Sequence, residues 1–381
     1  MTRAFPAREY DDRLARLQKV LTEQGVDIAI VHTPENLCYL TGHSTPGYYT
    51  YQCLLVPAGG PPVLLTRETE TVNGRETTYL DRIDGYSDAV DPITATAALV
   101  RELCPGANRV ALEENSWFLP PRAHRQLLEE LNASTVPLDA PLAELRLIKS
   151  PLEIGKIRLA ARNTNAAMVA AAGAAEAGAS ERDIAAVAFT ALVSNGSEHF
   201  GMEPFIASGP RSGTIHSSWT DRRIGRGEPV LLEMAAAHSR YHAPLMHTVW
   251  QGQLSGDNQR MAEACLAARD ATVAAVRPGN TPAQAHTTCR TTIDSYGLLH
   301  TYRKRSGYSV GIAFAPDWGE GHILSLKETE QRPFQPGMVV HVVPTLRIAG
   351  VGGIGFSATV LVTDTGNEIL TFCQLGPELN Q

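Results

Sequence analysis

The first part of the chain alternates between helical and extended hydrophobic patterns. Residues 10–25 place Leu14, Leu17 and Leu21 at helical spacing, and a β-rich run over residues 26–31 follows directly. Further strand-like runs cover residues 53–56, 62–65 and 110–112, and helical patterns cover residues 93–103 and 121–131. This alternation predicts an α/β domain over residues 1–145. No glycine-rich phosphate loop follows these strands, and Gly59 and Gly60 before two prolines indicate a hairpin turn.

From residue 146 onward the pattern changes to helices that begin with capping sequences. Ser150 can cap a helix, Pro151 fits its first position and Glu153 can reach back to the cap. Similar starts occur at Ser180 and Thr281, a further helical pattern covers residues 257–276, and strand-like runs cover residues 229–234, 247–251, 338–343 and 359–362. This mixture predicts an α+β domain over residues 146–381.

Composition narrows the class of partner. The 381 residues suit two domains, and the formal net charge of −7 gives no electrostatic reason to bind nucleic acid. The one compact basic run, residues 303–305, is interpreted as a solvated turn. No apolar run is long enough to cross a bilayer, so no membrane partner is expected. A small-molecule substrate is therefore the expected partner.

The termini and cysteines bear on the cellular compartment. Residues 1–10 carry charges and a proline where a secretory signal needs an apolar stretch, which favours a cytoplasmic protein. The six cysteines are scattered without metal-site spacing, as is typical of reduced thiols in a core.

Several segments, in order along the chain, resemble those of one superfamily. They are residues 34–42 (PENLCYLTG), 146–154 (RLIKSPLEI), 206–210 with His216, 227–230, 335–338 and 359–362. This order resembles the creatinase and methionyl/prolyl aminopeptidase superfamily, whose catalytic domain has the pita-bread fold. The resemblance implies a pita-bread domain over residues 146–381 and favours a homodimer.

The superfamily's five metal-ligand positions are altered in this chain. By alignment of the motifs they hold Glu233, Pro244, Tyr308, Val343 and Ser357. One carboxylate cannot hold a dinuclear centre, so no metal or other cofactor is expected. A new metal site formed by His238, His242 and His247 is the less favoured interpretation, because an odd separation puts the last two on opposite faces of a strand. Scattered surface or core histidines are the favoured one.

A metal-free branch of the superfamily is the closer match. Residues 241–245, 315–320 and 341–344 resemble ectoine hydrolase, and the tail 375–380 resembles creatinase. This branch implies a metal-independent hydrolase of a non-peptide C–N bond, an amide or amidine, in a small polar zwitterionic compound. Tyr49 lies in the segment 47–52, which resembles an aromatic segment that helps to close the pocket in this branch, often from the partner subunit.

The match leaves other functions open. Met246, Gly355 and Ala358 stand where acidic residues are expected in one or other enzyme, so the catalytic set is interpreted as reassigned. A lyase, isomerase or cyclase on the same fold, a non-catalytic binding protein and an Xaa-Pro peptidase remain alternatives.

The candidate catalytic residues are His216, Glu233 and His341. His216 follows a Gly-Pro turn and has a near-neutral pKa suited to proton transfer, although a surface-loop histidine is the plainer interpretation. Glu233 lies in an apolar strand, where an unpaired carboxylate is costly, and it is either a base, a nucleophile or a structural carboxylate. His341 lies in another apolar strand, as a core histidine or a second acid/base group.

The remaining candidate residues are expected to bind the substrate. Asp317, Trp318 and Glu320 offer an aromatic face and two carboxylates for a cationic amidine or ammonium group. His242 and Tyr308 are expected to orient a substrate carboxylate or the reaction intermediate.

Overall fold

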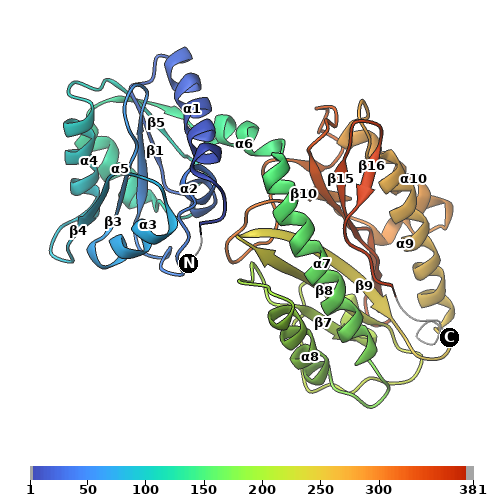
Figure 1. Cartoon of the computed structure of the whole chain (residues 1–381). Coiled ribbons are helices and arrows are strands. Elements are labelled where there is room, and N and C mark those ends of the chain that lie inside the picture. Colours follow the sequence, from blue (N-terminus) through green and yellow to red (C-terminus); the bar gives the residue numbers. More distant parts are fainter. Residues whose placement is uncertain (1–2, 375–381) are drawn as a thin grey trace. The chain divides into compact units, whose positions relative to one another are not determined.

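A computed structural model describes residues 3–374 and divides into two compact units, residues 1–146 and 147–381. The creatinase-like tail, residues 375–380, lies outside the described residues. Figure 1 labels the helices and strands of each unit.

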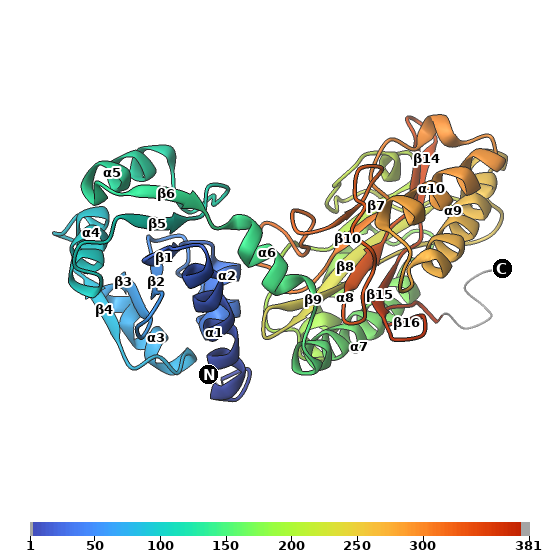
Figure 2. The same cartoon turned by 90° about the horizontal axis from the view of Figure 1, so that it is seen from above.

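The N-terminal unit is a mixed sheet with helices on both faces (Figure 2). Its strands are β1 Ile28–Val31, β2 Cys53–Pro57, β3 Val63–Arg67, β4 Ile83–Tyr86, β5 Arg109–Leu112 and β6 Ser134–Pro137. Its helices are α1 Ala7–Glu23, α2 Pro34–Thr41, η1 Glu68–Glu70, α3 Thr71–Thr77, α4 Pro92–Leu103, α5 Pro121–Leu131 and α6 Asp139–Leu147. The strand order is β4-β3-β2-β1-β5-β6, in which β1, β5 and β6 are parallel neighbours. The α/β class expected from the sequence is confirmed.

The hydrophobic pattern locates the central strands of this sheet better than its edges. The expected hairpin turn is confirmed, since β2 and β3 pair antiparallel on either side of Gly59 and Gly60. The pattern missed β4 and β6, which are the two edge strands and have mostly exposed or half-buried residues. An edge strand that buries so little carries almost no hydrophobic signal.

The C-terminal unit mixes helices with antiparallel strands, as the sequence predicts. Its helices are α7 Pro151–Gly173, α8 Glu181–Ser194, η2 Gly209–Gly213, α9 Gly256–Ala275, α10 Pro282–Ser295 and η3 Leu299–Thr301. Its strands are β7 Phe205–Ser208, β8 Val230–His238, β9 Tyr241–Val249, β10 Gly307–Ser309, β11 Ser325–Leu326, β12 Val339–Val342, β13 Thr345–Ile348, β14 Gly352–Gly355, β15 Ala358–Val362 and β16 Asn367–Ile369. The capping boxes at Ser150, Ser180 and Thr281 are present as expected.

Within residues 147–374, three antiparallel groups of strands build this unit. The orders are β7-β8-β9, β11-β10-β12-β15-β16 and the hairpin β13-β14. Helix α7 packs along β8 and β9, and α9 packs beside α10 (Figure 1). A core of small and aliphatic residues from α7, α8, β8 and β9 joins the first sheet to its helices. These groups of strands therefore fix the positions of β8, β10, β12 and β13, which carry or adjoin the candidate site residues.

The β8–β9 hairpin is longer than the sequence indicates. Its register runs from the pair Val230 and Val249 to the pair His238 and Tyr241. The pattern missed much of it because alanines fill the end of β8 and Pro244 interrupts β9. Pro244 is tolerated because β9 is an edge strand of its sheet, where a missing amide donor costs little.

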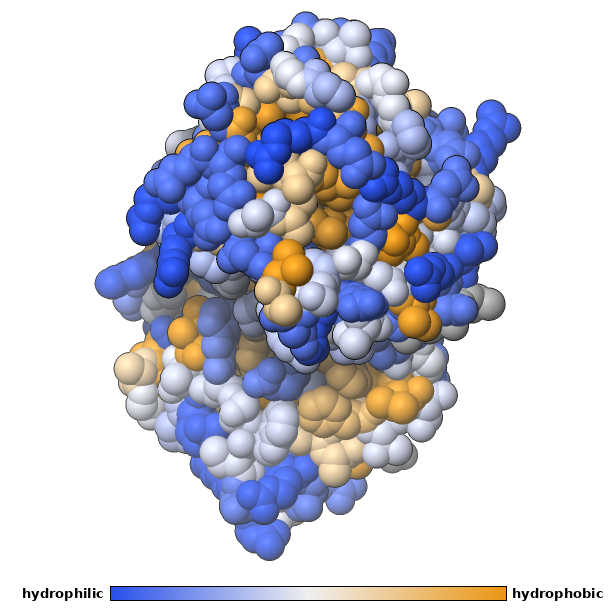
Figure 3. All heavy atoms as spheres, turned by 90° about the vertical axis from the view of Figure 1, so that its left-hand side faces the viewer, coloured by the Kyte–Doolittle hydropathy of each residue, from blue (hydrophilic) through white to orange (hydrophobic). Residues whose placement is uncertain are grey.

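Hydrophilic residues cover most of the face shown in Figure 3, and hydrophobic residues form separate patches on it. Among residues 3–374, no helix has both the length and the apolar character needed to cross a bilayer.

Candidate active site

Glu233 lies in the middle strand of the β7-β8-β9 sheet, opposite Phe205 on one side and Met246 on the other. Its side chain is nearly buried, with 7% of the residue exposed. No hydrogen bond or ion pair to Glu233 exists within the described part of the chain. Burial raises the pKa of Glu233 to about 7, and the positive charges of Lys304 and Arg347 oppose this rise. The carboxyl group is therefore poised to exchange a proton near neutral pH.

Lys304 and Arg347 are the two cations that act on Glu233, and neither was predicted from the sequence. Lys304 lies in the loop before β10, and its Nζ donates a hydrogen bond to Thr345 Oγ1 at 3.0 Å. Burial lowers the pKa of Lys304 to about 8, with repulsion from Arg347 as the second cause. Burial also lowers the pKa of Arg347, while Glu233 opposes the shift. The charges of Glu233, Lys304 and Arg347 therefore affect one another's pKa values.

The interpretation of residues 303–305 as a solvated turn holds for Arg303 and Arg305, which are exposed, but not for Lys304, which is half-buried. Lys304 points inward, and Arg305 places its guanidinium 4.6 Å from the ring centroid of Tyr308 while donating to Ser325 Oγ. Three consecutive basic residues show no hydrophobic periodicity, so the sequence does not indicate which of the three side chains points inward. For Arg347 a signal does exist, because Leu346 is buried in the core and alternation puts Arg347 on the opposite face of β13.

His216 lies in the loop that follows η2, with a left-handed backbone (φ 53°) that is unusual for histidine. Its ring centroid is 5.5 Å from that of Phe205, the residue opposite Glu233. Burial lowers the pKa of His216, Arg347 and Lys304 lower it further, and Asp317 opposes them. His216 is exposed, as the surface-loop interpretation has it, and Phe205 lies between it and the strand position of Glu233. The charges of Lys304 and Arg347 affect both residues.

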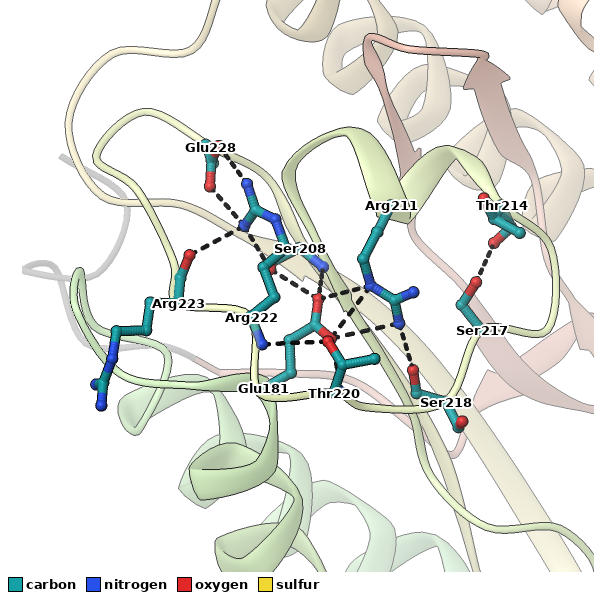
Figure 4. A network of polar contacts seen from close by, with 10 residues as sticks. All are labelled: Glu181, Ser208, Arg211, Thr214, Ser217, Ser218, Thr220, Arg222, Arg223 and Glu228. Carbon is teal, nitrogen blue, oxygen red and sulfur yellow. Dashed lines mark hydrogen bonds and ion pairs between the residues drawn. The ribbon is translucent and has the colours of Figure 1, made fainter.

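Glu181 holds the loop that carries His216 at both ends (Figure 4). This buried carboxylate accepts hydrogen bonds from the amide and hydroxyl of Ser208 before the loop, both at 2.8 Å. It also accepts them from the amide and hydroxyl of Thr220 after the loop, at 2.9 and 2.7 Å. Arg211 lies 3.4 Å from the same carboxylate. The segment between Ser208 and Thr220 is thereby closed onto one side chain at the start of α8.

A chain of hydrogen bonds links β10, β12 and β9, the last of which pairs with the strand of Glu233. Trp318 Nε1 donates to Tyr308 Oη at 2.9 Å, and His341 Nδ1 lies 3.0 Å from the same oxygen. His341 Nε2 lies 2.7 Å from Ser357 Oγ, which also accepts a hydrogen bond from the Met246 amide. Burial lowers the pKa of His341 to about 3 and raises that of Tyr308, with Glu233 contributing to the second shift. Both groups are therefore neutral near pH 7.

The hydrogen-bond chain leaves two arrangements of its protons. A tryptophan Nε1 can only donate, so Tyr308 Oη accepts that bond. If His341 Nδ1 also donates to Tyr308, the phenol proton is free to be donated elsewhere. If Tyr308 donates to Nδ1 instead, His341 Nε2 donates to Ser357. Moving protons along the chain therefore turns Tyr308 into a donor toward the site.

Apolar side chains form the walls around these groups. Tyr308 packs against one cluster of Phe205, Ala235 and Trp318 and against a second of Leu231, Met246 and Val343. Such walls exclude water and strengthen electrostatic interactions inside the site. The site thus combines an ionisable carboxyl group, two cations and a neutral phenol, which are groups suited to a small polar compound.

Two of the expected substrate-binding residues have structural partners instead. His242 is fully buried, with Nδ1 2.8 Å from the Arg240 carbonyl oxygen and Nε2 accepting from the Gly201 amide at 3.2 Å. Glu320 is buried in an ion pair with Lys149 Nζ at 2.8 Å. Both ring nitrogens of His242 are occupied, and Glu320 is neutralised, so neither side chain is available to a ligand in this arrangement.

The remaining expected residues differ in how close they come to the site. Asp317 is exposed, and its Oδ1 accepts hydrogen bonds from the amides of Trp318 and Gly319 at 2.7 and 2.9 Å. Its negative charge opposes the lowering of the pKa of His216. Tyr49 is 82% exposed and belongs to the N-terminal unit.

The fold and site now define the class of protein. Residues 155–364 match the model of metallopeptidase family M24, and residues 13–148 match the creatinase/prolidase N-terminal domain. Because the first match alone covers more than half of the chain, the protein belongs to family M24. The expected pita-bread architecture of the catalytic domain is confirmed.

Individual proteins are similar to this chain either in sequence or in structure. A protein of Sinorhizobium fredii described as an uncharacterized hydrolase/peptidase is 31% identical over 96% of each chain. An ectoine hydrolase of Halomonas elongata is 26% identical over 96% of each chain. Among solved structures, a prolidase from Pyrococcus horikoshii has a TM-score of 0.86 at 22% identity, covering 96% of this chain and 99% of its own. The last likeness concerns the fold alone.

The family name implies a metal, and the residues of this site do not fit one. Within residues 3–374, no group of three or more His, Cys, Asp or Glu side chains could hold a metal ion. Pro244 and Val343 offer no side-chain donor atom, and the one carboxylate faces Lys304 and Arg347. Two nearby positive charges repel a divalent cation, which also needs several oxygen or nitrogen ligands.

Proposed function

We propose that the protein is a metal-independent hydrolase that opens a non-peptide C–N bond, an amide or amidine, in a small polar zwitterionic compound. The observation that carries the proposal is Glu233, a nearly buried carboxyl group without a hydrogen bond to any described residue, whose pKa is raised to about 7. A general base works best when its pKa lies near the working pH. The ectoine hydrolase relative, similar along nearly the whole chain, supports the same class of bond.

In the proposed reaction, Glu233 removes a proton from water while the water oxygen bonds to the amide or amidine carbon. The electron pair of the C=O or C=N bond moves onto its heteroatom, and Tyr308 stabilises that atom by donating a hydrogen bond. When the pair returns, the C–N bond breaks. The proton held by Glu233 passes through His216 to the leaving nitrogen, which restores the carboxylate.

His341 has a different role in this proposal from the one the sequence suggests. A group with a pKa of about 3 carries no proton to donate as an imidazolium near neutral pH. His341 instead holds Tyr308 and selects its proton arrangement through Ser357. It is therefore a positioning residue.

The decisive experiment uses the full chain in heavy-oxygen water with a chelator present. Ectoine, creatine and N-acetylated amino acids are incubated with it, and the products are analysed by mass spectrometry. We expect one solvent oxygen in the product of the accepted compound and a loss of about 10²-fold or more in kcat for Glu233→Gln and His216→Ala. Glu368→Gln, which removes an exposed carboxylate paired with Arg158, is the matched control and retains activity.

Other outcomes separate the competing functions. A product without solvent oxygen would exclude hydrolysis and favour a lyase, isomerase or cyclase. Cleavage of Xaa-Pro dipeptides only after addition of manganese or cobalt would favour a peptidase. Ligand binding without any turnover would favour a binding protein.

A further inference from the structure

The candidate site contains more positive than negative charge. Lys304 and Arg347 both act on Glu233, yet neither lies within ion-pair distance of any carboxylate in the described residues. Other cations of this unit do find partners, such as Arg222, which lies 2.6 Å from Glu228. Thr345, which accepts a hydrogen bond from Lys304, lies on the same face of β13 as Arg347, and its hydroxyl donates to Met246 Sδ, opposite Glu233 on β8. The two half-buried cations thus leave net positive charge beside one carboxylate, which is costly without a counter-ion.

The hydrogen-bond donors of these two cations are mostly unused. Lys304 Nζ makes one hydrogen bond, to Thr345 Oγ1, although an ammonium group can donate three. Arg347 Nε is buried and has no hydrogen-bond partner, and its guanidinium donates to no other described residue. A buried donor without an acceptor costs free energy, so such groups normally meet a ligand or water.

Cavities lie beside both cations. A cavity of 570 Å³ is lined by Lys304, and a second of 380 Å³ is lined by Arg347. His300 and Arg303 line both cavities, so the two share a rim that bears a positive charge. A rim of this sign raises the local concentration of small anions.

We infer that Lys304 and Arg347 form an anion-binding subsite that holds a carboxylate of the substrate next to the bond that Glu233 acts on. The inference rests on the proposed function for the identity of that bond, but binding by the subsite can be measured without turnover. A guanidinium presents two parallel donors that match a carboxylate, and the ammonium adds a second charge. The substrate class is thereby narrowed to carboxylic acids that carry an amide or amidine close to the carboxylate.

Matched probes that differ only in the carboxylate test the subsite. N-acetylglycine is compared with its primary amide, and N-acetyl-β-alanine with its primary amide, so that each acid has an uncharged partner. Dissociation constants are measured by calorimetry on the full chain. We expect the wild type to bind at least one acid about tenfold or more tightly than its neutral partner, because charge-assisted hydrogen bonds are strong.

Variants then assign the preference to the two cations. Arg347→Gln and Lys304→Met should each bring the preference for the acid to within about twofold, without weakening the neutral probe. Arg347→Lys should keep part of it, because the charge remains but the fork is lost. Arg158→Gln removes an exposed arginine of α7 and should retain the full preference.

Glu233→Gln separates this inference from the proposed function. Removing the neighbouring negative charge should tighten acid binding severalfold, whereas it should abolish turnover. Loss of turnover is therefore compatible with an intact subsite, and a missing reaction would not count against it.

Three results would overturn the subsite. The first is equal binding of every acid and its neutral partner by the wild type. The second is an unchanged preference in both Arg347→Gln and Lys304→Met. The third is displacement of the acids by inorganic phosphate at lower concentration than by acetate, which would assign the subsite to phosphate esters instead.

Discussion

Trp318 Nε1 donates a hydrogen bond to Tyr308 Oη over 2.9 Å, and this fixes the phenol from one side while His341 holds it from the other. The tryptophan comes from the loop after β10, whereas the histidine comes from β12. Tyr308 itself stands at a position where the superfamily has a metal-binding histidine. A neutral donor that is held this firmly can stabilise a developing negative charge without a metal.

Tyr308→Phe should therefore lower kcat by about 10²-fold while changing ligand affinity little. The change removes an acceptor from Trp318 and a partner from His341, so we also expect a loss of ~1–3 kcal/mol in unfolding free energy. Steady-state kinetics and denaturant unfolding measure the two effects. Tyr241→Phe is the control, because its hydroxyl donates to Glu153 and lies in another buried polar pair. Equal loss of kcat in both variants would show a general effect of instability.

The pH dependence of activity follows from Glu233 and Lys304. The proposed base must be ionised, so activity should rise with pH through about 7, and the carboxylate-binding ammonium must be charged, so activity should fall through about 8. Tyr308, whose pKa is raised by burial and by the charge of Glu233, stays protonated across this range. We expect a bell-shaped profile of kcat/KM with a narrow maximum between these values. A flat profile from about pH 6 to about pH 9 would contradict both assignments.

Stability should respond to the same carboxyl group. The pKa of Glu233 in the folded state is above its ordinary value of 4.5, so its favourable contribution is complete below pH 4.5 and is lost as pH rises through about 7. Glu233→Gln should therefore gain stability relative to the wild type between about pH 5 and about pH 8, by ~1–3 kcal/mol. Denaturant unfolding of both proteins at the two pH values measures this difference. Glu368→Gln should show no such pH-dependent gain, since Glu368 is exposed.

Glu181 should affect catalysis through His216 although it lies at the far side of the loop. Glu181→Gln keeps the shape but loses the charge that attracts the amide and hydroxyl donors of Ser208 and Thr220, so we expect ~2–4 kcal/mol of destabilisation and a lower kcat. Activity of Glu181→Gln, His216→Ala and the double variant gives a double-mutant cycle. If Glu181 acts by positioning His216, the double variant should be no slower than His216→Ala alone. Strictly additive losses would show that the two residues act independently.

The sequence predicted those parts of the molecule whose hydrophobic pattern is repeated or whose ends are capped. Helix α7 is an example, because Ser150 and Glu153 define its start without reference to the rest of the chain. The strand of Glu233 was predicted from its apolar run, and the carboxylate within that run singled out Glu233 itself. Edge strands such as β4 gave no signal, since their side chains are largely exposed.

The site was harder to predict because its partners come from distant segments. Lys304 and Arg347 lie far apart in the sequence, and Lys304 reaches β13, the strand of Arg347, through its hydrogen bond to Thr345. Nothing local in the sequence distinguishes Lys304 from Arg303, yet Lys304 is half-buried and donates to Thr345, whereas Arg303 is exposed. Conversely, His242 resembles a ligand in sequence but satisfies both ring nitrogens with backbone groups. Which polar groups remain unpaired is a property of tertiary structure.

The last prediction concerns the buried ion pair of Glu320 with Lys149, two residues that lie far apart in the sequence. Lys149, just before α7, donates to Glu320 Oε2 at 2.8 Å, and both side chains are almost completely buried. Ser309 Oγ and the Ile312 amide also donate to this carboxylate, at 3.3 and 3.2 Å. The carboxylate of Glu320 thus connects the residue before α7 with the end of β10 and the segment after it, which indicates a structural role.

Lys149→Met should therefore destabilise the C-terminal unit by ~3–5 kcal/mol, because it leaves the carboxylate of Glu320 buried without its counter-charge. Combining it with Glu320→Gln should recover part of that loss, since the uncompensated charge is then removed as well. Denaturant unfolding of the wild type, both single variants and the double variant measures the effect. In the double variant, affinity for the carboxylate probes should remain that of the wild type. Selective loss of that affinity with stability intact would return Glu320 to the substrate-binding set.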